Sequence, residues 1–232
     1  MDTVTRSVLP YHYDWISEDV LAKIQGYPPG VIGVATGFLG RYREFDACLN
    51  IVWKPPTTET IYYIGVDVCK HFNSMVRSTL AKPENEWLWI LGDDHAFCQD
   101  LWLNLYERNV DIVVPLCLRK NAKPIPILDD PTHKISPTEA ISGKSGLLEW
   151  GGLTGNAGML IRRRVFEQME PPWFRAGQDD PEYSGSDYYF CRAAHRAGLK
   201  IYVDLDNPIG HIHHFAIWPR RDENGEWYVD YR

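Results

Sequence analysis

Two acidic residues and a histidine follow a hydrophobic run. Residues 87–91 (Trp-Leu-Trp-Ile-Leu) are followed directly by Gly92, Asp93, Asp94 and His95. Adjacent carboxylates repel each other unless a cation or a protein partner compensates their charge. Oxygen ligands suit Mg²⁺ or Mn²⁺, and an added imidazole favours Mn²⁺. The turn therefore predicts a divalent metal site; the alternative is an Asx turn that caps the next helix.

Three further histidines lie close to the C-terminus, at positions 211, 213 and 214. In an extended segment His211 and His213 share a face, because side chains alternate with a period of two. We expect one of these imidazoles to complete the metal site that Asp94 and His95 begin. A solvated polar patch is the alternative for the same residues.

Asp187 follows Gly185 and Ser186 at the expected start of a helix. The positive end of a helix keeps a carboxylate ionised. An ionised carboxylate in a cleft is a usable general base for a hydroxyl group. Asp187 is therefore the candidate catalytic residue, and a first-turn Asp that only stabilises its helix is the alternative.

Residues 151–158 (Gly-Gly-Leu-Thr-Gly-Asn-Ala-Gly) form a segment of small side chains. They do not make the dinucleotide fingerprint, because no strand precedes them and a strand follows. Small residues allow the backbone to approach a sugar or a phosphate closely. We expect Gly155 to contact the donor molecule, with a plain flexible loop as the alternative.

Short apolar runs alternate with segments of helical periodicity along the chain. Strands are predicted at 31–36, 60–64, 87–91, 112–115, 158–161 and 201–203, and helices at 67–80, 164–169 and 187–197, with others from Ser17 and after Phe97. This alternation predicts an α/β fold with a mainly parallel sheet. In such sheets ligands bind outside the carboxyl ends of the strands, where the Asp93–Asp94 turn falls. Residues 119–148 and 171–185 are rich in Pro and Gly, and we expect loops there.

The composition restricts the class of protein. The chain has 232 residues, of which 44 % are hydrophobic, which is enough for a full core. A net charge of −7 disfavours a protein that simply coats nucleic acid. No apolar run is long enough for a membrane span, and the first ten residues lack the apolar core of a signal peptide. Five cysteines without paired spacing favour a reducing, cytoplasmic location.

The order of these segments resembles the GT-A glycosyltransferases, in particular the family that includes cellulose and hyaluronan synthases. The resemblance spans residues 31–211 and rests on four segments: 87–95, 158–163, 185–191 with 197–198, and 210–211. It implies a Rossmann-like, mixed and mainly parallel central sheet flanked by helices, in one domain over residues 1–232. Residues 27–118 would bind the nucleotide sugar, residues 119–215 the acceptor, and residues 216–232 form a C-terminal tail.

The resemblance also assigns residues to the donor. Thr36, at the end of the first predicted strand, would line the base pocket. Asp67 and Asn73 match a stretch that faces the nucleotide in such enzymes. The acidic turn of the family falls on residues 92–94, and its third position, the metal ligand, maps onto Asp94. Its first position is usually an Asp that touches the ribose. Here it is Gly, so that contact is missing or shifted to Asp93.

Three points of this alignment concern the metal and the base. An alternative register uses Asp93 and His95 as the metal-binding pair. The acidic pair before the acceptor-side helix, usually Glu-Asp, reads Ser186-Asp187, so the base is kept and the Glu is not. The late histidine of the family maps onto His211, with His213 as the second choice.

The implied activity is that of a metal-dependent glycosyltransferase of the hexosyltransferase type. The donor would be a nucleotide-diphosphate sugar, with a UDP-sugar expected, and the cofactor Mn²⁺ or Mg²⁺. Asp187 would take the proton of the acceptor hydroxyl in an inverting displacement, although GT-A folds support retention as well. The acceptor is open among a glycan, a protein, a small molecule and a modified nucleobase in DNA, and no membrane partner is expected.

Two other functions fit parts of the sequence. A sugar nucleotidyltransferase would need a glycine-rich basic loop after the first strand, which residues 37–41 (Gly-Phe-Leu-Gly-Arg) resemble only in part. A non-catalytic carbohydrate- or nucleic-acid-binding domain of the same fold would explain Gly92 and Ser186 in place of acidic residues.

Overall fold

The structure is a computed structural model of the chain. It describes residues 3–7, 16–37, 40–120, 125–175, 185–213, 217–224 and 226–231. For residues 3–7, 217–219 and 227–231 it describes the backbone alone.

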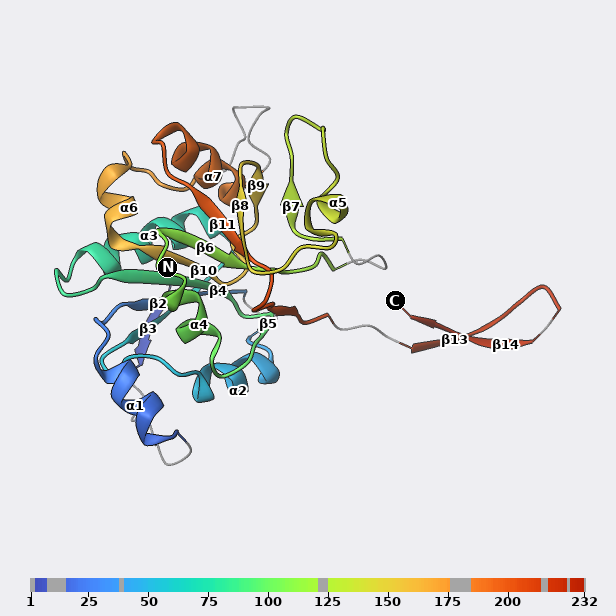
Figure 1. Ribbon diagram of the computed structural model, residues 1–232. Helices are drawn as coiled ribbons and strands as arrows, with labels where there is room; N and C mark the ends of the chain where they lie inside the picture. The colour runs from blue at the N-terminus through green and yellow to red at the C-terminus, as the bar shows by residue number, and fades with distance from the viewer. Residues whose placement is uncertain are drawn as a thin grey trace.

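An eight-stranded sheet forms the centre of the fold (Figure 1). Its strands, in spatial order, are β1 (Thr3–Ser7), β3 (Glu59–Ile64), β2 (Val31–Thr36), β4 (Trp87–Gly92), β10 (Met159–Arg162), β6 (Ile112–Pro115), β11 (Ile201–Asp204) and β8 (Leu147–Trp150). β2 pairs in parallel with β3 and β4, and β6 with β11, whereas β10 is antiparallel to β4 and β6. Five strands therefore run in one direction, namely β2, β3, β4, β6 and β11. The predicted α/β fold with a mixed, mainly parallel sheet is confirmed.

Helices cover both faces of the sheet (Figure 1). One face packs against α3 (Val68–Leu80), α6 (Arg163–Gln168) and α7 (Ser186–Arg196). The other packs against α1 (Glu18–Gln25), α2 (Arg43–Ile51) and α4 (Leu101–Glu107). The sheet is thus enclosed between two layers of helices, which explains why its strands are continuous apolar runs.

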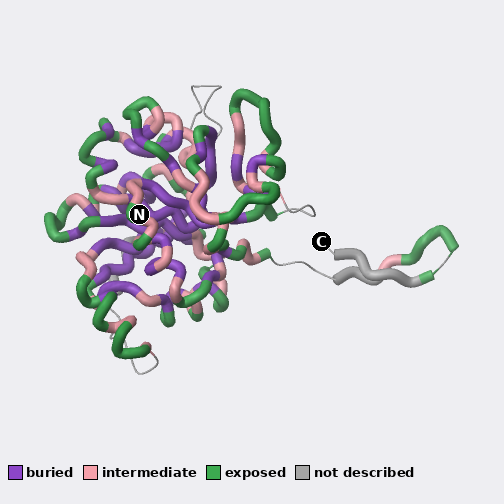
Figure 2. Tube along the Cα trace, viewed as in Figure 1, coloured by how far each residue is buried: buried purple, intermediate pink, exposed green. Residues whose placement is uncertain are grey.

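The central strand β4 shows how the sequence fills both layers. Trp87, Trp89 and Leu91 pack towards α1, α2 and α4, and the alternate residues Leu88 and Ile90 pack towards α3. All five are buried, in the interior that Figure 2 colours purple. Because side chains alternate along a strand, a run without polar residues supplies both cores and leaves only its end free for chemistry.

Some expected elements differ from those observed. The strands and helices predicted from residue 31 to residue 203 are present, but α2 and β1 were not predicted. Ser17 precedes α1 without a side-chain cap bond, and Ser184, a possible cap of the helix predicted at 187–197, lies outside the described residues. Residues 119–148, where a loop was expected, contain β7 (Leu128–Asp129), α5 (Pro137–Ile141) and the start of β8. β8 directly precedes the segment 151–158, so the prediction that no strand stands before that segment is wrong.

The tail after residue 211 contains a hairpin of β13 (Ile217–Arg221) and β14 (Trp227–Tyr231), which extends from the body of the fold in Figure 1. Exposed aromatic residues can act as stacking platforms for sugars or bases, but Trp150, Trp173 and Phe174 are buried in the core. The side chain of Trp218 is outside the described part of the structure.

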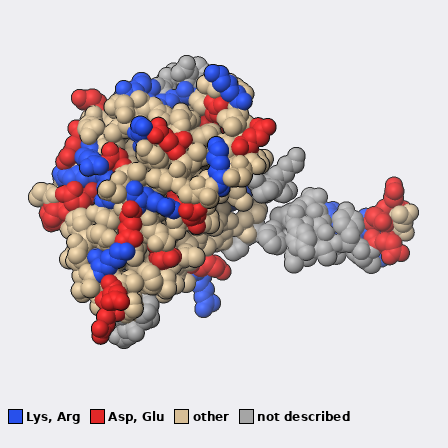
Figure 3. All heavy atoms as spheres, in the orientation of Figure 1, with Lys and Arg blue, Asp and Glu red and all other residues tan. Residues whose placement is uncertain are grey.

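The charges are mixed over the face shown in Figure 3, where basic and acidic side chains are interspersed. The net charge of −7 is therefore not gathered in one patch of that face. None of the described helices is long and apolar enough to cross a membrane. All five cysteines are free.

Three consecutive arginines at residues 162–164 make specific contacts. The guanidinium carbon of Arg162 lies 3.6 Å from the centroid of the Tyr106 ring. Arg163 donates hydrogen bonds to main-chain carbonyls at and beyond the end of α3, those of Thr79, Leu80, Lys82 and Asn85. Arg164 makes an exposed ion pair with Asp111. Arg163 therefore fastens the C-terminal end of α3 to α6.

Replacement of Arg163 tests this role, with its neighbour as the matched control. We expect Arg163→Met to lower the free energy of unfolding by about 2 to 3 kcal/mol, because charge-assisted hydrogen bonds to helix-end carbonyls are lost. Arg164→Met should cost less than about 1 kcal/mol, since its side chain is 62 % exposed. Urea unfolding of both variants measures the difference, and equal losses would contradict the assigned contacts.

Candidate functional site

Most of the residues predicted to act on the donor lie at one edge of the sheet. The carboxyl ends of β2, β3, β4, β6 and β11 meet there, because these strands are parallel. Thr36 ends β2, Asp67 follows β3, and Asp93 and Asp94 follow β4. The edge is where ligands bind in open α/β sheets.

A short ladder brings His211 back to the acidic turn. β5 (His95–Ala96) pairs antiparallel with β12 (Gly210–His211), so that His211 stands opposite His95. The amide of Ile212 also donates to the carbonyl of Asp94 at 2.7 Å. The two imidazole centroids are 5.7 Å apart. This pairing joins the end of β4 to the segment after β11.

Asp94, His95 and His211 form a group that fits a metal ion. Their candidate ligand atoms all lie within 4.8 Å of one another. His211 Nε2 is 3.3 Å from Asp94 Oδ2, and His95 Nε2 is 3.8 Å from Asp94 Oδ1. A mixed oxygen and nitrogen donor set of this kind suits Mn²⁺.

Hydrogen bonds distinguish the two imidazoles. His211 Nδ1 lies 3.0 Å from the carbonyl oxygen of Leu118 and must donate to it, which leaves Nε2 to face Asp94. A metal-binding histidine usually donates its other ring N–H in this way. In His95, Nδ1 accepts the amide proton of Gly92 at 3.0 Å, so the neutral ring carries its proton on Nε2. The arrangement therefore favours Asp94 and His211 over His95 as ligands.

The charges of this group follow from burial and pairing. Burial opposes ionisation of Asp94, but hydrogen bonds from His211 and Lys120 outweigh it and hold its pKa well below the usual range. Burial, partly opposed by Asp94, lowers the pKa of His95 to about 4. The bond to Asp94 is the largest of the effects that raise the pKa of His211 to about 10. Without a metal, Asp94 is ionised, His211 is protonated and His95 is neutral at pH 7.

Gly92 leaves space for the side chains that follow it. A Cβ atom at this position would lie 2.7 Å from Asp94 Oδ1 and 3.3 Å from His95 Cε1. A side chain at position 92 would therefore require the Asp94 carboxylate to shift and His95 to give way slightly. The observed placement of Asp94 beside His95 favours glycine here.

Thr36 and Asp93, which are both predicted to face the nucleotide, are hydrogen-bonded to each other. The Thr36 hydroxyl donates to Asp93 Oδ2, and the Asp93 amide donates to the carbonyl of Ala35 at 3.3 Å. Burial raises the pKa of Asp93, the Thr36 bond opposes this, and the charge of Asp94 adds to it. Asp93 thus links the ends of β2 and β4 by hydrogen bonds beside the metal group.

Asp187 lies against the glycine segment. It is in the first turn of α7, and its Oδ1 accepts the Tyr188 amide at 3.0 Å. A Cβ atom on Gly155 would lie 3.4 Å from Asp187 Oδ2, so Gly155 lies against this carboxylate, and its contact with the donor stays a prediction. Burial raises the pKa of Asp187, which brings a carboxylate closer to the range of a general base.

A ladder of main-chain bonds connects this carboxylate with the metal group. The carbonyl of Cys117, next to Leu118, accepts the amide of Ile127 at 2.9 Å, and the carbonyl of Ile127 accepts the amide of Gly155 at 3.4 Å. Since paired strands are about 4.8 Å apart, Cys117 and Gly155 are separated by roughly 10 Å. The ladder therefore runs from the residue beside Leu118 to the residue that lies against Asp187, with Ile127 between them.

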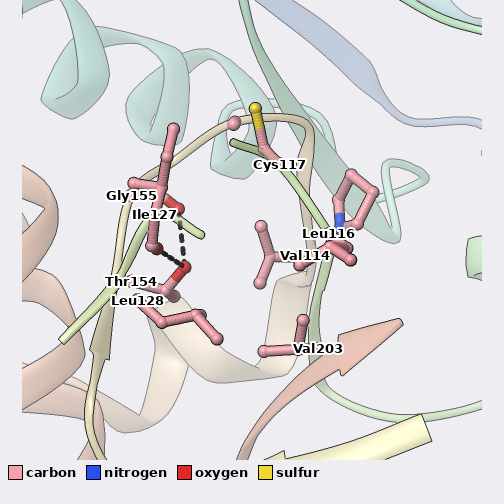
Figure 4. Close-up of a pocket in the computed structure, with 10 residues that line it drawn as sticks. Val114, Leu116, Cys117, Ile127, Leu128, Thr154, Gly155 and Val203 are labelled. Atoms are coloured by element: carbon pink, nitrogen blue, oxygen red, sulfur yellow. Dashed lines mark hydrogen bonds between the residues drawn. The ribbon is translucent and has the colours of Figure 1, made fainter. Parts of the chain in front are cut away.

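The space beneath this ladder is a packing gap. Val114, Cys117, Ile127, Thr154 and Val203 are among its mainly apolar lining residues, and it has no room for a water-sized molecule (Figure 4). The Thr154 hydroxyl is 3.0 Å from the carbonyl oxygen of Ile127 and 3.3 Å from that of Gly155. These bonds fix the segment that supports Asp187.

Three other predicted site residues lie outside the metal group. Asp67 caps α3 by accepting the Lys70 amide at 2.9 Å. Asn73 is buried, and its amide group bonds to the main chain of Phe174 at 2.7 and 3.2 Å. Their nucleotide contacts stay predictions, to which these structural bonds give an alternative. His213 is exposed and is not in the metal group, because β12 ends at His211 and the alternation assumed for an extended segment stops there.

Lys120 is a site residue that the sequence did not indicate. Its ammonium group forms an ion pair with Asp94 Oδ2. No spacing or motif pointed to it. Its position shortly after β6, which ends at the same sheet edge, is the signal that would have found it.

The comparisons with known proteins bear on the fold. No protein-family model matches the sequence, and a search of curated proteins finds no match. Among solved structures, the crystal structure of A197 from STIV matches with a TM-score of 0.58 and 14 % identity, over 86 % of this chain and 93 % of that chain. At this identity the likeness shows the fold alone.

The two histidines can be compared by the same substitution. In each position Asn keeps the Nδ1-type hydrogen bond, as acceptor for Gly92 or as donor to Leu118, and removes Nε2. We expect His211→Asn to weaken Mn²⁺ binding at least about tenfold, the effect of about 1.4 kcal/mol. His95→Asn should change it by less than about threefold. Calorimetric Mn²⁺ titration decides, and a larger loss for His95→Asn would reverse the assignment of ligands.

Proposed function

We propose that this protein is a metal-dependent glycosyltransferase that uses a nucleotide-diphosphate sugar, with a UDP-sugar as the expected donor. The observation that carries the proposal is the pairing of Asp94 with a correctly oriented His211 at the carboxyl edge of the sheet. Asp187, which lies against Gly155 at the other end of the Cys117–Ile127–Gly155 ladder, would be the general base. The order of these residues is the one that the resemblance to GT-A enzymes required.

Asp94 and His211 would hold Mn²⁺ or Mg²⁺. A divalent cation there would neutralise the charge that develops on the diphosphate leaving group. Thr36 and Asp93, at the ends of β2 and β4, are placed to contact the nucleoside portion beside that group.

Asp187 would act on the acceptor. As the acceptor oxygen bonds to the anomeric carbon, the bond from that carbon to the phosphate oxygen breaks and the hydroxyl proton passes to the Asp187 carboxylate. The Ile127 segment lies between Cys117 and Gly155, so the donor would lie over this ladder, with its diphosphate at Asp94 and His211 and its sugar towards Asp187. The raised pKa of the buried Asp187 supports its role as the base in a direct displacement by a hydroxyl acceptor.

Nucleotide binding gives the first test. With Mn²⁺ present, UDP at 100 times its Kd should stabilise the fold by about 2.7 kcal/mol, or roughly 5 to 10 °C in Tm for a chain of this length. The shift should disappear with EDTA and in Asp94→Asn. If neither UDP, GDP nor TDP shifts the Tm with Mn²⁺ or Mg²⁺, the proposal fails. Pyrophosphate release from a nucleoside triphosphate and a sugar phosphate would indicate a nucleotidyltransferase instead.

Replacement of the base gives the second test. Asp187→Asn should keep donor binding within about twofold and reduce transfer by about 10² to 10⁴, the usual contribution of a general base. Turnover is measured as UDP release with an acceptor, and donor binding by calorimetry. Loss of donor binding in this variant would move Asp187 to the donor side.

The same variant should change the pH dependence of the Tm. A carboxyl whose pKa is raised on folding binds its proton more tightly in the folded state, so it lowers stability above its folded pKa. This cost disappears as the pH falls towards the unfolded value of about 3.9. Asp187→Asn should therefore raise the Tm at pH 7 and raise it less at pH 4, while a merely structural Asp187 would give a lower Tm at pH 7.

A further inference from the structure

Asp94 has two cationic partners on one carboxylate oxygen. His211 Nε2 lies 3.3 Å from Oδ2, and the Lys120 ammonium group pairs with the same oxygen. Lys120 Nζ is also 5.8 Å from the centroid of the Tyr42 ring. The lysine is therefore held at the metal group by a carboxylate and an aromatic face.

A divalent cation bound to Asp94 and His211 would lie beside Asp94 Oδ2, where the Lys120 ammonium group now lies. His211 directs Nε2 to Asp94 as a potential ligand, because its Nδ1 is bonded to the Leu118 carbonyl. The Lys120 ammonium group offers only hydrogen-bond donors and no lone pair for a metal. Its charge repels the incoming cation, so Lys120 has to leave Asp94 when the metal binds.

We propose that Lys120 takes the place of the divalent cation on Asp94 in the metal-free protein and moves to the phosphates of the donor when the cation binds. Four methylene groups give the ammonium the reach for this movement, and a compact ammonium is a good partner for phosphate oxygens. The second step rests on the proposed function. Metal and donor would then bind with positive coupling, because the donor supplies the charge that Lys120 loses.

The first measurement uses Mn²⁺ alone. We compare wild type, Lys120→Met and the control Lys200→Met, which removes an exposed lysine paired with Glu149. The free Mn²⁺ signal in electron paramagnetic resonance gives the Kd. Lys120→Met should bind Mn²⁺ about tenfold more tightly than wild type, and Lys200→Met should equal wild type. Equal or weaker Mn²⁺ binding by Lys120→Met, or no Mn²⁺ binding by either protein, overturns the first step.

The second measurement adds UDP at saturating Mn²⁺. Lys120→Met should bind UDP about tenfold more weakly than wild type, opposite in direction to its effect on Mn²⁺. General damage to the site would weaken both ligands, so the two directions together identify the role. Unchanged UDP affinity in Lys120→Met overturns the second step. Absence of UDP binding in wild type overturns the second step together with the proposed function, while the Mn²⁺ measurement still decides the first.

Discussion

The pairing of β5 with β12 is the interaction on which the site depends. Without it Asp93 and Asp94 would be two adjacent carboxylates at a sheet edge, with Lys120 paired to Asp94 but no imidazole beside it. Two ladder positions bring His211 opposite His95 and place its Nε2 beside Asp94. Partial burial of the turn disfavours ionised carboxylates, and the contact of His211 with Asp94 offsets this effect. The segment after β11 therefore stabilises the negative charge of the turn after β4.

Gly92 and main-chain groups determine how the two imidazole rings are oriented. Gly92 gives its amide to His95 Nδ1 and leaves room for the Asp94 carboxylate. The carbonyl of Leu118 accepts from Nδ1 of the other imidazole, which directs its Nε2 to Asp94. Two chemically identical side chains are thus oriented differently by their main-chain partners, and His211 is the better placed of the two to bind a metal.

Much of the fold and part of the site followed from the sequence. The apolar runs predicted β2, β4 and β6, because buried strands need no polar face, and the strand-end rule placed Asp94 at the edge. Local sequence patterns do not predict the other features of the site. The orientation of the His95 and His211 rings depends on their main-chain partners. His213 lies outside the metal group because β12 ends at His211, and the pairing of Lys120 with Asp94 depends on the fold. Asn73 shows the same limit, since its partner Phe174 is far away in the sequence.

The position of Asp187 links the stability of the fold to the chemistry proposed for it. A carboxylate that is ready to accept a proton at neutral pH must have an environment that favours the proton, and burial beside Gly155 provides one. The same burial destabilises the folded chain whenever the group is ionised. At the other end of the ladder Asp94 has the reverse environment, since cations there favour the ionised form. Two carboxylates on one sheet edge are thus pushed in opposite directions, which is the condition for one to take a proton and the other to bind a metal.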